Sequence, residues 1–379
     1  MANNNDNKVL NVPHLRFPEF TEEWETKPIN DLAVVIGGGT PDTTVKSYWD
    51  GKIQWFTPSE IGKTKYVDSS LRTITEDGLN NSSAKRLPPN TILLSSRATI
   101  GECSLSLREC ATNQGFQSLV SKKCNVDFLY YLIQTKKNDL IRKSCGSTFL
   151  EISANEVRKI QVSIPSDVEQ QKIAGLLSLI DERIATQNKI IERLETLIKG
   201  IRNEIFWKLR KNVGFNAIIG DVLDYEPPQS YIVEDTEYID KGTPVLTANK
   251  AFILGYTSET EGIYDKGDCI IFDDFTLDSK YVDFPFKVKS SAIKILTAEN
   301  KELLRYTFEF LKYLDLSTSE HKRHYIAETQ NQEFILPTTQ IVRTIAHTFS
   351  ILSLRMETAI KQRLLFEKQK QYLLRQMFI

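Results

Sequence analysis

Apolar residues recur at helical spacing in two long segments of the chain. In the first segment, residues 164–206, steps of four and three alternate along an apolar stripe. The stripe consists of Ile173, Leu177, Ile180, Ile184, Ile191, Leu194, Ile198, Ile201 and Ile205, with Gln187 at a polar position. This alternation is typical of a coiled-coil seam, so we predict a helix with a length on the order of 60 Å. The second segment, residues 336–378, begins with the same stripe and then loosens.

The two segments form an internal repeat, because they align with each other at one constant offset. Identical residues at aligned positions include Pro165 and Pro337, Ala174 and Ala346, and Arg183 and Arg355. One long helix cannot bury its own seam, so we expect the two helices to pair as an antiparallel coiled coil. Two equal halves in one chain then give a pseudo-two-fold internal repeat.

The regions before the two helical segments contain short strand-like runs and a helical stretch. In residues 14–164 these runs are rich in β-branched and aromatic residues, with Gly, Pro, Asn and Ser between them. Residues 215–336 repeat the order of elements. Corresponding runs are residues 55–57 and 245–247, 90–94 and 267–271, and 125–129 and 300–304. We therefore predict a mixed α/β (α+β) fold, with two globular domains separated by the two long antiparallel helices.

Composition restricts the class of protein further. The chain has 379 residues, and 48 Lys and Arg residues against 49 Asp and Glu residues leave a net charge of -1. A protein that binds nucleic acid through its overall charge is therefore excluded. Any such binding needs local basic patches or the positive surface of a partner.

Redox and targeting signals point to the cytoplasm. The five cysteines form no CxxC pair, which argues against both a disulfide framework and a zinc site. No apolar run reaches the roughly 18 residues that a membrane span needs. Residues 1–8 do not resemble a signal peptide. We expect a reduced, cytoplasmic protein with no membrane partner.

Candidate catalytic groups are few, and each has a simpler interpretation. The glycine-rich stretch 37–41 lacks the spacing of a phosphate-binding loop and reads as a turn. Asp283, Glu299 and Lys301 imitate the carboxylate and lysine spacing of metal-dependent nucleases, but chance produces such a trio in a highly charged chain. The two histidines within residues 321–324 lack a third metal ligand, and the cations between them favour phosphate. We predict no catalytic residue and no metal site.

Polar loops with scattered cations follow the predicted strands at matching places in both halves. Arg, Lys, Asn, Gln, Ser and Thr read base edges or hold phosphates, and loops set on a sheet carry them into a groove. In the first half we predict DNA contacts at Thr57, Ser59, Ser96, Arg97, Asn113, Gln114, Lys143, Ser147 and Thr148. In the second half the predicted contacts are Asn249, Lys250, Lys322, Arg323 and His324.

An ordered set of short motifs resembles the DNA-specificity (S) subunits of type I restriction–modification systems. The set includes residues 15–20 (LRFPEF) with Trp24, 38–41 (GGTP), 53–61 (IQWFTPSEI), 113–116 (NQGF), 169–174 (EQQKIA) and 179–181 (LID). The resemblance covers nearly all of the chain, and the order of the motifs makes it specific. The second half departs from it, because residues 341–343 (IVR) stand where the first half has 169–171 (EQQ). This divergence suits a second domain that reads a different half-site.

The resemblance implies a non-catalytic reader of double-stranded DNA. Target-recognition domains would occupy residues 1–164 and 212–336, with spacer helices at 165–211 and 337–379. Each domain would bind one half of a split, asymmetric sequence. The helices would fix the distance between half-sites and dock two modification subunits, and restriction subunits through them. The implied partner-binding residues are Glu169, Gln170, Ile173 and Asp181. S-adenosylmethionine, ATP and magnesium are expected on the partner subunits, and no cofactor on this chain.

Two alternatives of a different class stay open at the level of sequence. A self-contained nuclease or methyltransferase would use the trio Asp283, Glu299 and Lys301. A coiled-coil scaffold without a DNA role would use the heptad helices alone.

Overall fold

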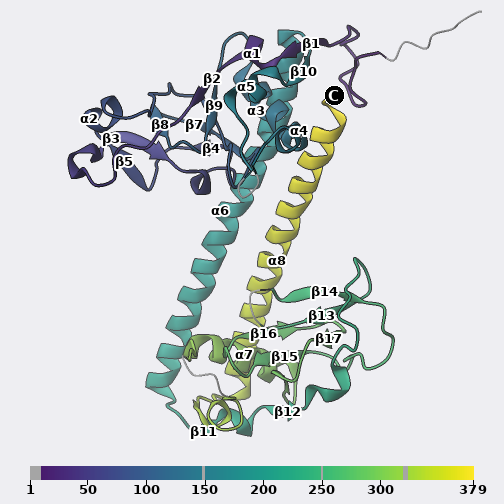
Figure 1. The fold of residues 1–379 in the computed structure, drawn as a ribbon. Helices are drawn as coiled ribbons and strands as arrows, with labels where there is room; N and C mark the ends of the chain where they lie inside the picture. The colour runs from purple at the N-terminus through teal and green to yellow at the C-terminus, as the bar shows by residue number, and fades with distance from the viewer. Residues whose placement is uncertain (1–9, 147–149, 249–250, 319–322) are drawn as a thin grey trace, which may run out of the picture. The chain divides into compact units, whose positions relative to one another are not determined.

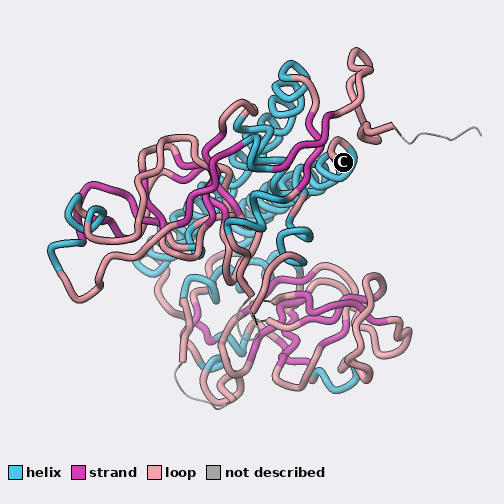
Figure 2. The backbone as a smooth tube through the Cα atoms, turned by 45° about the horizontal axis from the view of Figure 1, so that its top comes forward, coloured by secondary structure: helices cyan, strands magenta, loops and turns pink. Residues whose placement is uncertain are grey.

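The chain folds into two compact units that share both long helices. The computed structural model describes residues 10–146, 150–248, 251–318 and 323–379. Unit 1 comprises Met1–Asn188 together with Lys361–Ile379, and unit 2 is Lys189–Ile360. The long helices are α6 (Asp167–Asn212) and α8 (Thr339–Gln376), shown in Figure 1. Strands and helices of both units confirm the mixed α/β class (Figure 2). The four-segment division of the chain stays a prediction.

The strands of unit 1 form two sheets and a strand pair in the described residues. They are β1 (Glu25–Pro28), β2 (Ala33–Gly37), β3 (Trp49–Phe56), β4 (Tyr66–Val67), β5 (Arg72–Ile74), β6 (Ile92–Leu94), β7 (Cys103–Ser106), β8 (Cys110–Thr112), β9 (Gln117–Ser121) and β10 (Gln161–Ile164). The larger sheet has the order β2-β9-β6-β7-β4 and the smaller one the order β5-β3-β8, while β1 pairs with β10. In the smaller sheet the central strand β3 has an antiparallel neighbour, β5, and a parallel one, β8.

Side chains cap the first turn of three of the five short helices described in unit 1. The five helices are α1 (Ile29–Leu32), α2 (Glu76–Asn80), α3 (Val126–Thr135), α4 (Lys137–Arg142) and α5 (Ala154–Lys159). The Asn125 side chain accepts a hydrogen bond from the Phe128 amide at 2.9 Å and so caps α3. Thr75 and Ser153 cap α2 and α5 in the same way. Because α3 buries six consecutive apolar and aromatic residues, it lies in the middle of the core.

The core of unit 1 includes the beginning of α6 and the end of α8. The buried residues there include Ile173, Leu177 and Ile180 of α6, Leu373 and Leu374 of α8, and Met377 and Phe378 directly after α8. The Asp181 carboxylate forms an ion pair with the Lys370 ammonium group at 2.8 Å. The Arg183 guanidinium lies 5.7 Å from the centre of the Phe366 ring. Residue numbers rise along one helix as they fall along the other, so the two helices run antiparallel within this unit.

Unit 2 repeats the strand order of unit 1, except that its larger sheet has no counterpart of β4 among the described residues. Its strands are β11 (Ala217–Ile218), β12 (Asp224–Glu226), β13 (Thr243–Leu246), β14 (Ile253–Thr257), β15 (Cys269–Asp273), β16 (Ser279–Val282), β17 (Lys287–Val288), β18 (Ile293–Thr297) and β19 (Glu333–Phe334). The sheet β14-β13-β17 has a central strand with one antiparallel and one parallel neighbour, as in β5-β3-β8. The sheet β12-β18-β15-β16 matches β2-β9-β6-β7, and the pair β11-β19 matches β1-β10. The internal repeat expected from the sequence is therefore present in the strand order.

The core of unit 2 joins α7 (Lys301–Leu314) to the end of α6 and the beginning of α8. The apolar centre contains Phe206, Tyr306, Phe310, Phe334, Val342, Ile345 and Phe349. The Glu309 carboxylate, buried on α7, pairs with Arg202 at 2.8 Å and with Arg305 at 2.9 Å. Such a buried carboxylate is tolerated only when its charge is compensated, so this trio ties α7 to α6.

One further property concerns membranes. Among the described residues, no helix combines the length and the apolar character that crossing a bilayer requires.

Candidate nucleic-acid interface

Three strand ends meet at one edge of the small sheet in unit 1. Because β3 and β8 are parallel, with Phe56 opposite Thr112, the loops that follow them leave the sheet on the same side. The Asn113 amide donates a hydrogen bond to the Phe56 carbonyl at 3.1 Å and so fixes the second loop beside the first. The predicted contacts Thr57 and Ser59 therefore lie next to Asn113 and Gln114.

The antiparallel strand β5 brings a further loop to this edge. Its first residue, Arg72, pairs with Trp55, so Leu71 lies level with the end of β3. The Glu60 side chain connects the two loops. One carboxylate oxygen accepts from the amide of Thr57 at 2.7 Å and from its hydroxyl at 2.6 Å, and the other accepts from the amide of Leu71 at 2.7 Å. Sequence reasoning missed Leu71, because an apolar residue in a loop carries no hydrogen-bonding signal.

The loop after β6 adds a cation to the same edge. The Ser96 amide donates to the Gly115 carbonyl at 2.8 Å, which places this loop against the Asn113 loop. The Arg97 guanidinium is half-exposed and pairs with Glu151 at 2.8 Å. The Ser96 side chain is buried, so it does not reach the surface. We call Thr57, Ser59, Leu71, Arg97, Asn113 and Gln114 the first edge.

Other predicted contacts of the first half lie beside this edge or outside the description. Lys143 is exposed at the end of α4, and its ammonium group lies 3.9 Å from the Glu156 carboxylate. Cys145 continues that segment and exchanges two backbone hydrogen bonds with Glu151, the partner of Arg97. Ser147 and Thr148 lie outside the described residues.

Unit 2 builds the same edge from its own small sheet. The Lys289 amide donates to the Leu246 carbonyl at 3.1 Å, as Asn113 does to Phe56 in unit 1. Lys289 and Ser290 are exposed there and take the places of Asn113 and Gln114. The sequence did not predict these two residues, because the register depends on the parallel pairing of β13 with β17. The only signal for them is a cation directly after a strand.

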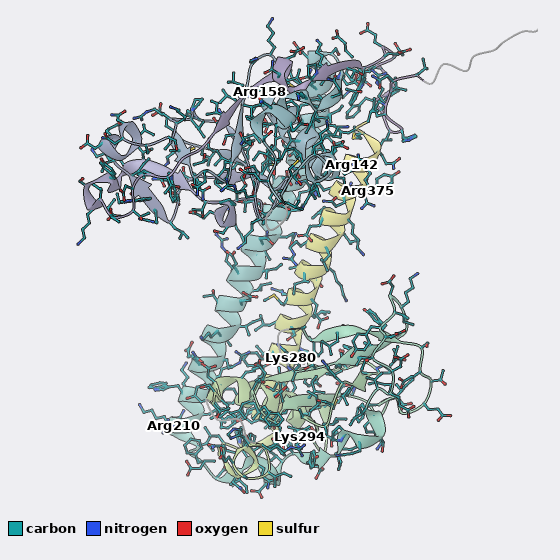
Figure 3. All side chains as sticks on the ribbon, viewed as in Figure 1. Arg142, Arg158, Arg210, Lys280, Lys294 and Arg375 are labelled. Atoms are coloured by element: carbon teal, nitrogen blue, oxygen red, sulfur yellow. The ribbon has the colours of Figure 1, made fainter. Side chains whose placement is uncertain are left out.

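The loop after β15 completes the second edge. The Asp274 amide donates to the Ala292 carbonyl at 2.9 Å, and the Asp274 carbonyl accepts from the His324 amide at 3.2 Å. Equivalent bonds in unit 1 join Ser96 to Gly115 and Ile152 to Ser96. The buried Asp274 carboxylate pairs with Lys294 at 3.1 Å, and Figure 3 labels Lys294 among the strands of unit 2.

Of the five DNA contacts predicted in the second half of the chain, one is exposed, one is buried and three lie outside the described residues. Arg323 is exposed, and its guanidinium donates to the Ser291 hydroxyl at 3.4 Å, which places it beside Ser290. His324 is buried, with its Nδ1 2.8 Å from the Glu328 carboxylate, so its side chain does not face a phosphate. Asn249, Lys250 and Lys322 lie outside the described residues. We call Lys289, Ser290 and Arg323 the second edge.

The expected partner-binding residues lie inside unit 1. The Glu169 side chain, 1% exposed, accepts two hydrogen bonds from the Arg16 guanidinium at 2.7 Å. The hydrogen bond and the charge of Glu169 raise the pKa of Arg16. The Gln170 side chain accepts from the Asn125 amide at 3.0 Å, and Ile173 is buried in the core. All three positions hold α6 against the domain and do not present a free surface.

Asp181 is the fourth expected partner residue, and it too is engaged within unit 1. Its carboxylate accepts from the Tyr131 hydroxyl at 2.7 Å and pairs with Lys370 at 2.8 Å. Burial, followed by the charge of Asp181, raises the pKa of the Tyr131 phenol well above its ordinary value. Tyr131 therefore stays a hydrogen-bond donor that fixes α3 on α6.

The trio considered for a nuclease does not form a catalytic group. Asp283 and Glu299 are exposed, and the Lys301 ammonium pairs with a different carboxylate, that of Asp268, at 2.8 Å. Within the described residues, no three His, Cys, Asp or Glu side chains gather closely enough to hold a metal ion.

Comparison with known proteins finds a family model that matches much of the first half of the chain. A family model described as the type I restriction modification DNA specificity domain matches residues 21–196. The type I restriction enzyme MjaIX specificity subunit of Methanocaldococcus jannaschii is 36% identical over 221 residues, which are 57% of this chain and 51% of that protein. The EcoR124I/EcoR124II specificity subunit of Escherichia coli is 42% identical over 151 residues, 38% of this chain and 35% of that protein.

Residues 21–196 are thus similar to type I restriction–modification DNA specificity domains. The resemblance expected from the sequence is confirmed, and the chain is a relative of type I restriction enzyme specificity subunits. These names agree with the prediction that the chain is a specificity subunit rather than an enzyme. The match spans about half the length of the Methanocaldococcus relative, 51%.

Solved structures share the fold over nearly the whole chain. The type I restriction–modification S subunit from M. genitalium superposes with a TM-score of 0.65 at 16% sequence identity, covering 97% of this chain and 99% of that one. A chain from a study of complex assembly and conformational transition of the type I restriction–modification system gives a TM-score of 0.52 at 13% identity, covering 94% and 97%. At these identities the likeness concerns the fold alone.

Proposed function

We propose that this chain is the DNA sequence-specificity subunit of a type I restriction–modification complex. In this proposal the first edge reads one half of a split, asymmetric sequence and the second edge reads the other half. The family match of residues 21–196 and the specificity-subunit names of the relatives support the recognition role. The bipartite reading is an inference of our own.

The single observation that carries the bipartite reading is the duplicated sheet edge. Both edges rest on the same hydrogen bond from the residue after a parallel strand, Asn113 to Phe56 and Lys289 to Leu246, at 3.1 Å each. The same backbone in two places with different side chains on it is what two different half-sites require. An amide pair in unit 1 and a Lys–Ser pair in unit 2 present different hydrogen-bonding groups to a base pair.

The structure refines which side chains we include as DNA contacts. Thr57, Ser59, Asn113 and Gln114 carry hydrogen-bonding groups suited to base edges, and Arg97 and Lys143 carry charge suited to phosphates. Ser147, Thr148, Asn249, Lys250 and Lys322 stay predicted contacts. We leave out Ser96 and His324, because their side chains are buried.

The remaining parts of the proposal concern the partner subunits. The two long helices would set the distance between half-sites and dock two modification subunits, and restriction subunits through them. Since Glu169, Gln170 and Ile173 are buried, docking on α6 would use its exposed positions, such as Val168 and Leu179. S-adenosylmethionine, ATP and magnesium would bind to the partners, which would carry out methylation and cleavage. The net charge of -1 fits this division, because partners would supply further positive surface.

Methylated-base sequencing of host DNA tests this function. The genome is compared with the gene for this chain intact and deleted, while the modification subunit is expressed in both. We expect one gapped, two-part adenine-methylation motif to vanish on deletion and to return when the gene is restored. A methylome that does not respond to the deletion would contradict the specificity role, and loss of a continuous motif would contradict the bipartite reading.

A further inference from the structure

The apolar side chain of Leu71 is exposed to solvent on an edge whose other side chains are polar. It is 87% exposed, the largest exposure among the exposed large apolar residues of the described chain. The register places it level with the end of β3, and the Glu60 carboxylate links its amide to the hydroxyl of Thr57. A single exposed leucine is common on a protein surface, so it is the place of Leu71 on this edge, and not its exposure alone, that points to a contact.

The backbone of Leu71 is fixed although its side chain is exposed. Its amide donates to Glu60 at 2.7 Å, and the amide of Ser70 donates to the Gln54 side chain at 2.7 Å. The Ser70 hydroxyl accepts from the amide of Trp55 at 2.9 Å and donates to the carbonyl of Arg72 at 2.6 Å. The Arg72 guanidinium stacks 3.5 Å from the centre of the Trp49 ring. A loop held this way loses little entropy when it meets a ligand.

We propose that Leu71 packs against the C5-methyl group of a thymine in the half-site read by unit 1. The inference rests on the proposed function and adds a specificity-determining contact to it. A methyl group is the apolar feature that a base pair displays in the major groove, and only thymine carries it among the unmodified bases. The polar residues of the first edge recognise the hydrogen-bond donors and acceptors of the bases, and Leu71 recognises the methyl group. Glu60 links the two kinds of contact, because it holds the Leu71 loop to Thr57.

The test compares one apolar truncation with one missing methyl group. Full-length chain is assembled with its modification subunits, and binding is measured to a duplex carrying the methylation motif of the wild-type complex. In parallel duplexes, deoxyuridine replaces each thymine of the first half-site in turn, which removes only the methyl group. Leu71→Ala is the variant, and Leu107→Ala is the matched control. Leu107 is 49% exposed and lies before β8, at the opposite end of that strand from Asn113.

We expect Leu71→Ala and one deoxyuridine substitution each to weaken binding by about fivefold, the effect of losing one to two buried methyl groups. Combined, they should weaken binding no further than either change alone, and Leu107→Ala should bind as wild type does. Leu71→Met, which keeps an apolar side chain of similar volume, should retain most of the preference for thymine over deoxyuridine.

Three results would overturn the inference while leaving the proposed function intact. The wild-type complex binds its motif, but Leu71→Ala binds equally well. Leu71→Ala weakens binding and no deoxyuridine does so, which would indicate a wedge between base pairs. Both changes weaken binding and their effects multiply, which would show that Leu71 and the methyl group do not touch. If the wild-type complex itself shows no preference for any motif, it is the proposed function that fails.

Discussion

The backbone amide of Lys289 donates a hydrogen bond to the carbonyl of Leu246 at 3.1 Å, across the parallel strands of unit 2. Asn113 makes the same bond to Phe56 in unit 1, also at 3.1 Å. The side chains differ while the backbone is the same, which is how one scaffold presents two sets of reading groups. The first predictions follow from this equivalence.

Removing the Lys289 side chain should weaken binding to the second half-site. Lys289→Ala is expected to lower affinity and to reduce the slope of log K against log salt concentration by about one, if its ammonium group contacts one phosphate. Lys301→Ala is the control, since Lys301 is also an exposed lysine of unit 2 and pairs with Asp268, which precedes β15, away from this edge. Fluorescence titration at several salt concentrations measures both. Equal losses in the two variants would mean a general charge effect, and lost turnover in Lys301→Ala would revive the nuclease alternative.

Glu169 should stabilise unit 1 and not bind a partner directly. Its side chain is 1% exposed and is held by Arg16. Glu169→Ala would leave the guanidinium without its buried partner, so we expect the free energy of unfolding to fall by about 3–5 kcal/mol. Urea unfolding measures this, with Glu195→Ala on the exposed face of α6 as the control that changes little. If stability is kept and only assembly with modification subunits is lost, then the partner role expected from the sequence is right.

Acid should weaken unit 2 through Glu259. Hydrogen bonds from the Asp235 amide and the Lys287 ammonium hold the pKa of Glu259 below its ordinary value of 4.5. Because the folded pKa is the lower one, the stabilising contribution is complete above pH 4.5 and is lost as pH falls through the folded value. Lys287 belongs to β17, so the loss affects the strand that carries the second edge.

The measurement is urea unfolding at a series of pH values from about 3 to 6. Glu259→Gln should be less stable than wild type at the upper end and should lose less stability on acidification. Glu261→Gln is the control, because the buried Lys287 uses only the backbone carbonyl of that residue. If the free energy of unfolding of Glu259→Gln falls with pH as steeply as that of wild type, then Glu259 is not the group whose protonation weakens unit 2.

Thiol labelling should report DNA at the first edge. Burial raises the pKa of Cys103, Cys110, Cys124 and Cys269 to about 12, so a maleimide at neutral pH should react with exposed Cys145 alone. Cys145 is bonded through Glu151 to the segment of Arg97. DNA containing the motif should therefore slow labelling of Cys145, and DNA without it should slow labelling less. Equal rates with and without the motif would place the DNA elsewhere.

Much of the fold could be predicted from periodicity. The heptad stripe predicted that Ile173, Leu177 and Ile180 are buried, and all three are. Farther along the same stripe Ile191 and Leu194 are only half-buried, because a pair of helices covers one side of a seam and leaves the other to solvent. The order of strands in the two halves was also visible, because alternation and turn residues are local signals.

The site was less predictable, because it depends on pairings between distant residues. Asn113 was found through a motif, whereas Lys289 required the register of β13 with β17. Ser96 and His324 are polar residues in loops, which favoured a surface position. Backbone hydrogen bonds from Ile152 to Ser96 and from His324 to Asp274 close these loops against other segments and bury both side chains. No local pattern reveals such closures.

The central claim is that each unit reads one half of the DNA sequence. The most direct measurement replaces residues 14–164 with the corresponding domain of a relative that reads a different sequence, and then sequences methylated bases in a host expressing the modification subunits. We predict a hybrid motif in which one half changes while the other half and the distance between them stay the same. A motif that changes in both halves, or in neither, would contradict the account.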